Sequence, residues 1–128
     1  MLLYEFDDPT GLIIKNFTNF ASAKLGLTKP PKVVVKRDAA YSADNHTFGH
    51  YDPDEDKIIL QISNRQILDI LRTLAHELVH GKQRQNNELK YDSGETGSEQ
   101  ENEANAVAGV IMRDFAQANK ELFKRPAE

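Results

Sequence analysis

Residues 63–85 read SNRQILDILRTLAHELVHGKQRQ, and this stretch decides the fold. It contains no proline, and its apolar residues recur every three or four positions, which predicts a helix with one buried face. These residues are Ile67, Leu68, Leu71, Leu74, Ala75 and Leu78. Ser63 and Gln66 have the spacing of a capping box, so we expect the helix to begin near Asn64.

Two histidines and a glutamate lie beside this apolar face. His76 and His80 are four positions apart, so on a helix both imidazoles can reach one metal ion. Glu77 projects beside them, where its carboxylate can take a proton from a water held by the metal. Two neutral nitrogens and a carboxylate base are what metal-assisted hydrolysis requires. The alternative is an ordinary amphipathic helix with two partly exposed histidines.

The sequence His76-Glu77-Leu78-Val79-His80 resembles the active-site helix of the zincin metallopeptidases. The resemblance implies one catalytic zinc ion, with His76 and His80 as ligands and Glu77 as the general base. Two histidines do not complete such a site, because catalytic zinc takes three protein ligands and keeps one open position. The chain has no cysteine, so the metal must be held by histidine and carboxylate alone.

The third ligand is expected on a later helix, in residues 99–105, which read EQENEAN. The run resembles the glutamate helix of the gluzincins, including the minigluzincins, and is also similar to that of ImmA/IrrE-type peptidases. The resemblance implies Glu101 as the third zinc ligand. Asn105 follows one helical turn later and can accept a hydrogen bond from the outer nitrogen of a ligand histidine, such as His76.

Two further glutamates compete with Glu101 for this role. Glu103 is the second candidate and Glu99 the third. Ser98 and Glu101 also have the spacing of a capping box, so Glu101 could be only a favourable charge at a helix N-terminus. The sequence alone leaves the choice among the three open.

The composition bounds the fold and the partners. A chain of 128 residues with 39% hydrophobic and 28% charged residues suits one globular domain, residues 1–128. The net charge of −4, without a basic stripe, argues against nucleic acid as a partner. We expect no signal peptide, no membrane span and a cytoplasmic location. Acidic residues between Glu88 and Glu103 are expected to favour a divalent cation and basic substrates, or to form only a solvated loop.

The other segments predict a single small α+β domain, which the resemblance makes zincin-like. Its short sheet, antiparallel or mixed, is expected to contain a β-hairpin, and the element order is α-β-β-β-α-α. The expected segments are a helix from Pro9 to about Gly26, a strand at Val33–Val35, a loop from Lys36 to Asn45, a hairpin of Thr47–Tyr51 and Lys57–Ile62, and a last helix from about Ser98 to Phe123.

The expected activity is zinc-dependent hydrolysis of peptide bonds. Glu77 would take a proton from the attacking water and pass it to the leaving amine. An extended peptide would add to an exposed strand edge of the hairpin. The alternative is a zinc-binding regulatory or interaction domain with little turnover. Glu77 favours the enzyme, because a structural zinc site has no use for a base and closes its fourth position with protein.

The group that would stabilise an oxyanion stays open. Tyr91, Tyr51, His46 and His50 are the candidates, since each can donate a hydrogen bond to a developing negative charge. Strand alternation places His46 and His50 on one face, so they are not expected to form a second helical ligand pair. The loop from Tyr91 to Gly97 could fold over the cleft and give a latent form.

Overall fold

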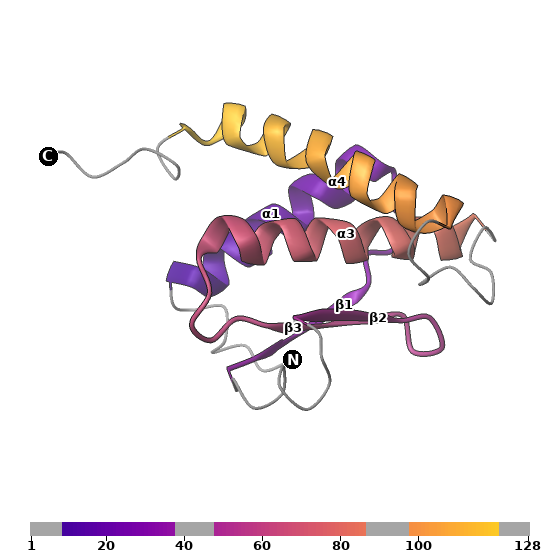
Figure 1. Cartoon of the computed structure of the whole chain (residues 1–128), viewed down its shortest axis with the longest axis horizontal. Helices are drawn as coiled ribbons and strands as arrows, with labels where there is room; N and C mark the ends of the chain where they lie inside the picture. The colour runs from indigo at the N-terminus through magenta and orange to yellow at the C-terminus, as the bar shows by residue number, and fades with distance from the viewer. Residues whose placement is uncertain (1–8, 38–47, 87–97, 121–128) are drawn as a thin grey trace, which may run out of the picture.

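The structure, a computed structural model, describes residues 9–37, 48–86 and 98–120. Over these ranges the chain forms helix α1 (Pro9–Leu25), strands β1 (Lys32–Lys36), β2 (Gly49–Asp52) and β3 (Lys57–Gln61), and helices α3 (Ile67–Gln85) and α4 (Glu99–Ala118). This confirms the expected α+β class and the order of elements (Figure 1). None of the described helices combines the length and the apolar character that a membrane crossing requires.

The three strands form one mixed sheet in the order β1-β3-β2. β2 runs antiparallel to β3, with Gly49 opposite Leu60 and Asp52 opposite Lys57, which confirms the predicted hairpin. β1 runs parallel to β3 on the other side. β2 is therefore an edge strand of the described sheet. One side of β2 pairs with β3, and its other side pairs with no described strand.

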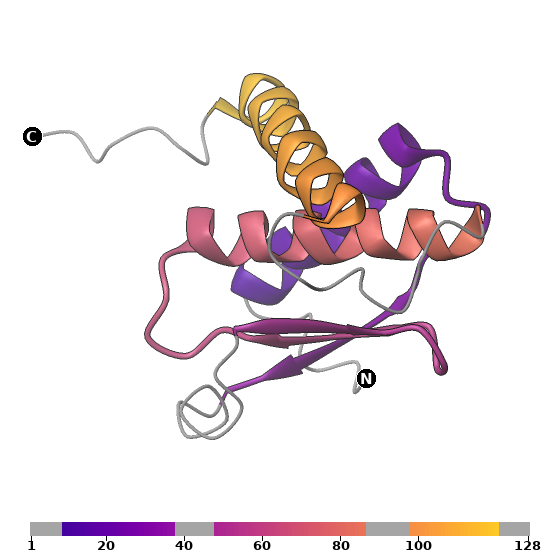
Figure 2. The same cartoon turned by 45° about the vertical axis from the view of Figure 1, so that its right-hand side comes forward.

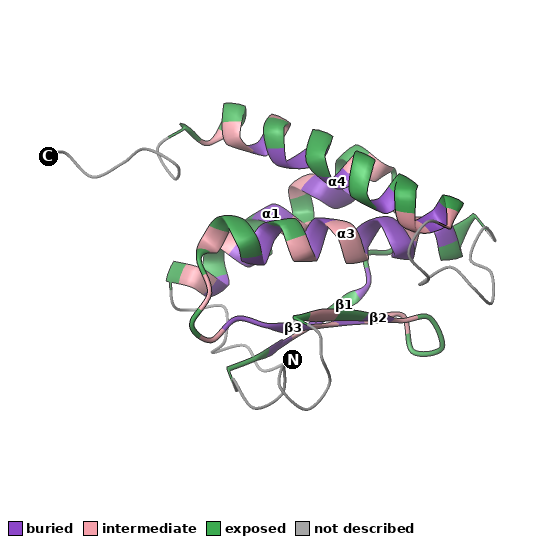
Figure 3. Ribbon diagram, viewed as in Figure 1, coloured by how far each residue is buried: buried purple, intermediate pink, exposed green. Residues whose placement is uncertain are grey.

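Helix α3 lies between the sheet and α4. It runs over one face of the sheet, and α4 crosses it on the side away from the sheet (Figures 1 and 2). The helices turn their buried faces inward (Figure 3). Leu71, Leu74, Ala75 and Leu78 of α3 have no exposed surface, so most of the predicted apolar stripe forms the centre of the core. Leu68, which the stripe also included, is 42% exposed.

Helix α3 begins later than the sequence predicts. Its N-cap is Gln66, whose side chain makes no capping hydrogen bond, so the expected Ser63–Gln66 capping box is wrong. Instead, the side-chain oxygen of Gln61 accepts a hydrogen bond from the Ser63 backbone N–H. Asn64 has a φ of 59°, a left-handed conformation that a helix cannot continue through. The hydrogen bond from Ser63 to Gln61 of strand β3 thus forms in place of the predicted capping box.

The other helix ends follow local signals more closely. Gly26 has a φ of 69° just after α1, and the backbone N–H groups of Gly26 and Leu27 bond the oxygens of Ala23 and Ser22. This is the Schellman arrangement, so the predicted end near Gly26 is confirmed. Helix α4 ends at Ala118, with Asn119 as its C-cap, so the predicted end at Phe123 is wrong.

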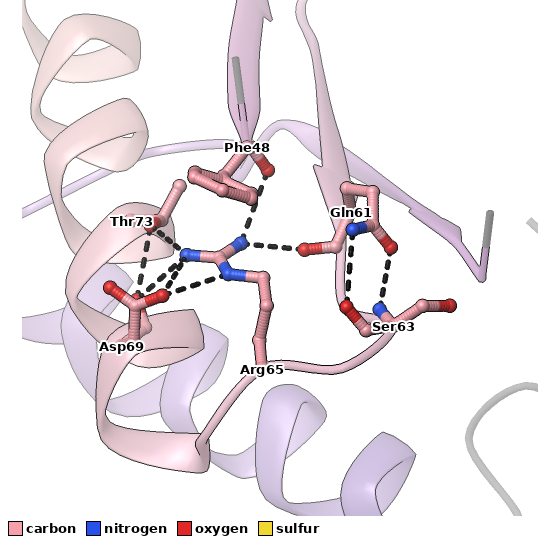
Figure 4. Close-up of polar contacts among 6 residues, drawn as sticks. All are labelled: Phe48, Gln61, Ser63, Arg65, Asp69 and Thr73. Atoms are coloured by element: carbon pink, nitrogen blue, oxygen red, sulfur yellow. Dashed lines mark hydrogen bonds and ion pairs between the residues drawn. The ribbon is translucent and has the colours of Figure 1, made fainter. Parts of the chain in front are cut away.

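Arg65 ties the edge strand to the helix (Figure 4). Its side chain is 4% exposed. On the sheet side it donates to the backbone oxygens of Phe48 at 3.3 Å and Gln61 at 2.6 Å. On the helix side it donates to Asp69 Oδ2 at 2.8 Å and Thr73 Oγ1 at 2.6 Å. Because the guanidinium is planar and rigid, these contacts hold the start of α3 against the end of β3 and the residue before β2.

Gly49 is a point of close approach between β2 and α3. A Cβ at Gly49 would overlap the Cγ2 methyl of Thr73. We expect Gly49→Ala to lower the free energy of unfolding by about 1–3 kcal/mol, because overpacking forces the strand or the helix to shift. Thr73→Ser removes that methyl and keeps the hydroxyl that accepts from Arg65. The double variant should therefore recover most of the loss.

Urea unfolding followed by circular dichroism measures these differences. Gly109→Ala is the matched control, because a Cβ there meets nothing within 4 Å. In a helix this substitution should stabilise by about 0.5–1 kcal/mol. If the losses of Gly49→Ala and Thr73→Ser simply add in the double variant, the two residues are not in steric contact.

Candidate metal centre

Three side chains from two helices meet at one point. His76 and His80 lie one turn apart on α3, with ring centroids 4.9 Å apart. Glu101 of α4 places Oε1 at 2.8 Å from His76 Nε2 and Oε2 at 3.1 Å from His80 Nε2. Ligand atoms of a tetrahedral zinc ion, with bonds of about 2.0–2.1 Å, lie roughly 3.3 Å apart. The ligand atoms of the three side chains all lie within 4.8 Å of one another, so the cluster could hold a metal ion.

The start of α4 directs Glu101 at α3. Ser98 is the N-cap, and its Oγ accepts a hydrogen bond from the Glu101 backbone N–H at 3.1 Å. The Ser98 half of the predicted capping box is thus present. The cap uses the Glu101 backbone, while the Glu101 carboxylate faces the two histidines. Capping and a ligand role are therefore compatible in one residue.

Gln83 determines the tautomer of His80. Its Nε2 donates to the backbone oxygen of Gln100 at 2.9 Å and to Glu103 Oε1 at 2.8 Å. Both partners only accept, so the amide orientation is settled and Oε1 of Gln83 faces His80 Nδ1 at 2.8 Å. An amide oxygen also only accepts. Nδ1 of His80 must therefore carry a proton and donate it.

This tautomer leaves two acceptors facing each other. In a neutral ring protonated at Nδ1, Nε2 holds a lone pair, and here it points at Glu101 Oε2 from 3.1 Å. Two lone pairs in that arrangement repel unless a cation lies between them or the ring takes a second proton. A divalent metal ion bound by both His80 Nε2 and Glu101 Oε2 would remove this repulsion. The donor set of His80 and Glu101 thus fits a metal.

His76 has a similar outer contact. Its Nδ1 lies 2.9 Å from Oδ1 of Asn105, one turn after Glu101 on α4. This is the contact that the sequence predicted for Asn105, and the hydrogen bond is confirmed. In the tautomer in which Nδ1 donates to Asn105, Nε2 of His76 presents a lone pair toward Glu101. Outer hydrogen bonds of this kind hold the ring orientation of metal ligands.

Glu77 lines a groove of about 410 Å³ beside the centre. The groove runs between the start of β2, at Phe48 and Gly49, and the helix face that carries His76 and Glu77, and it is also lined by Glu101. Burial raises the pKa of Glu77 above its usual range, and the Glu101 carboxylate raises it further, while His76 and His80 lower it. A carboxyl group that lines a groove can exchange a proton with a molecule bound there.

The other carboxylate candidates lie outside the cluster. Among the described residues, the three-member group that could hold a metal consists of His76, His80 and Glu101. Glu103 is exposed and accepts from Gln83. Glu99 is also exposed.

Most oxyanion candidates are not placed at the groove. Tyr51 is buried and donates to Asp56 Oδ1 at 2.6 Å, and burial together with this bond raises its pKa, so its hydroxyl is committed to the hairpin turn. His50 is exposed on β2 and is near enough to lower the pKa of Glu77. His46 and Tyr91, with the proposed covering loop 91–97, lie outside the described residues.

Gln83 is the residue that the sequence analysis missed. It is 1% exposed and sits one turn after His80 on α3. The available signal was a polar side chain three positions beyond a ligand histidine, close enough on a helix to reach its ring. That spacing is common in helices. Only the contacts of Gln83 with α4 show that it orients the ring of His80.

The fold and the centre define a small α+β domain with a cluster that could bind a metal ion. Comparison of the chain with protein-family models, with curated proteins and with solved structures found no match. Function is therefore inferred from the side chains of the centre and the groove.

Proposed function

We propose that this chain is a zinc-dependent metallopeptidase with a zincin-like site. The observation that carries the proposal is that the Nε2 atoms of His76 and His80 both face the Glu101 carboxylate, at 2.8 Å and 3.1 Å. Imidazole and carboxylate without thiolate is the donor set of a catalytic zinc site. Three protein ligands among the described residues leave a fourth tetrahedral position for water or substrate.

A zinc ion held there would supply a Lewis acid that makes water nucleophilic near neutral pH and polarises a substrate carbonyl. Glu77 takes the proton from the attacking water and passes it to the leaving amine. Its place in the groove beside the cluster supports this role. Gln83 and Asn105 hold the two histidine rings in the orientation that the chemistry needs.

The substrate is an extended peptide. The groove reaches Gly49, the first residue of edge strand β2, and β2 pairs with β3 on one side only. A peptide that adds to this edge forms main-chain hydrogen bonds, which demand little of its sequence. Such pairing would bring a peptide carbonyl past Glu77 and the cluster.

Metal removal tests this proposal. Protein purified without a polyhistidine tag is analysed for zinc and incubated with a mixture of peptides, and products are identified by mass spectrometry. We expect about one zinc per chain, as in sites with three protein ligands and an open position. We also expect peptide cleavage that a chelator abolishes and added zinc restores. Zinc without cleavage would favour the regulatory or interaction domain, and no zinc after reconstitution would remove the basis of the proposal.

A further inference from the structure

Arg72 lies at the groove, close to the centre. It precedes His76 by one helical turn on α3, and together with His76, Glu77 and Glu101 it lines the groove. Its side chain is exposed. Among the described residues it has no hydrogen-bond or ion-pair partner. An arginine in this position can reach a ligand in the groove without breaking a contact within the described fold.

The nearby carboxylate of Asp69 is already neutralised. Asp69 also lines the groove, three positions before Arg72 on the same helix. Arg65 approaches its Oδ2 from Nε at 2.8 Å and from Nη2 at 2.8 Å (Figure 4). Because the Arg65 side chain is only 4% exposed and bound on several sides, it cannot leave Asp69 for a ligand. The positive charge of Arg72 is therefore not balanced by Asp69.

Arg65 itself is not a ligand-binding group. Its three nitrogens donate to Phe48, Gln61, Asp69 and Thr73. The hollow of about 460 Å³ around it is thus lined by a guanidinium whose donors are engaged. Arg72 is the arginine of the groove that has its donors available.

Among the described residues that line the groove, Arg72 is a positively charged side chain without an ion-pair partner. Arg65 and Asp69 balance each other. Arg72 remains, and a guanidinium binds a carboxylate through two parallel hydrogen bonds. We infer that Arg72 binds a carboxylate of the peptide substrate, so that cleavage favours peptides with Asp, Glu or a free C-terminus near the cleaved bond.

This inference rests on the proposed peptidase function and names its substrate class. It differs from the basic substrates that the acidic sequence 88–103 suggested. Residues 88–97 of that sequence lie outside the described structure. The carboxylate has two sources, an acidic side chain or the C-terminus of the peptide. β2 and α3 run in the same direction, with Gly49 against Thr73 and Tyr51 against Gly81. A peptide antiparallel to β2 would therefore present its C-terminal part to Arg72.

The test compares cleavage by the parent, Arg72→Gln and Arg72→Glu. Each is incubated with a mixed peptide library, once with free and once with amidated C-termini, and the residues flanking each cleaved bond are counted. For matched Asp and Asn peptides with amidated C-termini, we expect Arg72→Gln to lower kcat/KM about fivefold for Asp and to leave Asn unchanged, as for one partly exposed ion pair. Arg72→Glu should disfavour Asp further. Arg113→Gln, an equal charge change at a side chain 69% exposed on α4, is the control.

Binding without turnover gives a second readout. In a Glu77→Gln background, labelled Asp and Asn peptides are titrated by fluorescence anisotropy with and without Arg72→Gln. The Asp peptide should bind about fivefold tighter only when Arg72 is present. A preference confined to free C-termini would identify the terminal carboxylate as the source. Cleavage with no preference for an acidic side chain or a free C-terminus, or a preference that survives Arg72→Gln, would overturn the inference and leave the peptidase intact. A parent that neither binds nor cleaves any peptide would overturn both.

Discussion

Glu77→Gln should abolish peptide cleavage and leave zinc bound. The substitution keeps the size of the side chain and removes the group that takes and returns the proton. General acid–base catalysis contributes about 10²–10⁴-fold, so we expect kcat to fall by that factor. Glu77 is not a member of the three-residue cluster, so the zinc content should stay at the parent value. The measurements are peptide cleavage rates and zinc content on the same preparation.

The matched control is Glu99→Gln, which removes one exposed carboxylate from the first turn of α4. It should cleave peptides at the rate of the parent. A Glu77→Gln variant that cleaves as fast as the parent would show that Glu77 is not the base. Loss of zinc in that variant would instead place Glu77 among the metal ligands.

Glu101→Ala should remove zinc from the protein. Glu101 supplies the carboxylate that faces both histidines, and two imidazoles do not hold a catalytic zinc ion alone. The affinity should fall by more than the roughly 10- to 100-fold that loss of an outer hydrogen-bond partner costs. Zinc should raise the melting temperature of the parent, because it binds the folded state, and should not raise that of the variant. Elemental analysis and thermal unfolding with added zinc measure both effects.

Glu103→Ala is the matched control on the same helix. Its carboxylate accepts from Gln83 and not from the histidines, so zinc should remain. Gln83 keeps its bond to the Gln100 backbone oxygen, and with it the orientation that protonates Nδ1 of His80. If Glu103→Ala loses zinc and Glu101→Ala keeps it, Glu103 is the third ligand. Glu101→Gln, which preserves side-chain volume, separates loss of the charge from a failure to fold.

The sequence by itself determined the local features of the site. The 3.6-residue period of a helix places His76 and His80 on one side, whatever packs against them. The same period places the two histidines beside the apolar stripe. The stripe can therefore be buried in the core while the imidazoles face Glu101. The hairpin and the Ser98 cap also follow from neighbouring residues, and the structure confirms both. These features depend on spacing over a few residues, which a sequence displays directly.

Only the tertiary structure decided which distant groups meet. Glu99, Glu101 and Glu103 share one helix turn, and it is the crossing of α4 over α3 that brings the carboxylate of Glu101 between the histidines. The capping box at Ser63 failed because Gln61, held in β3, competes for the same backbone. The role of Gln83 depends on acceptors 17 and 20 positions away. Such contacts have no sequence period, since they are set by how helices and sheet pack in three dimensions.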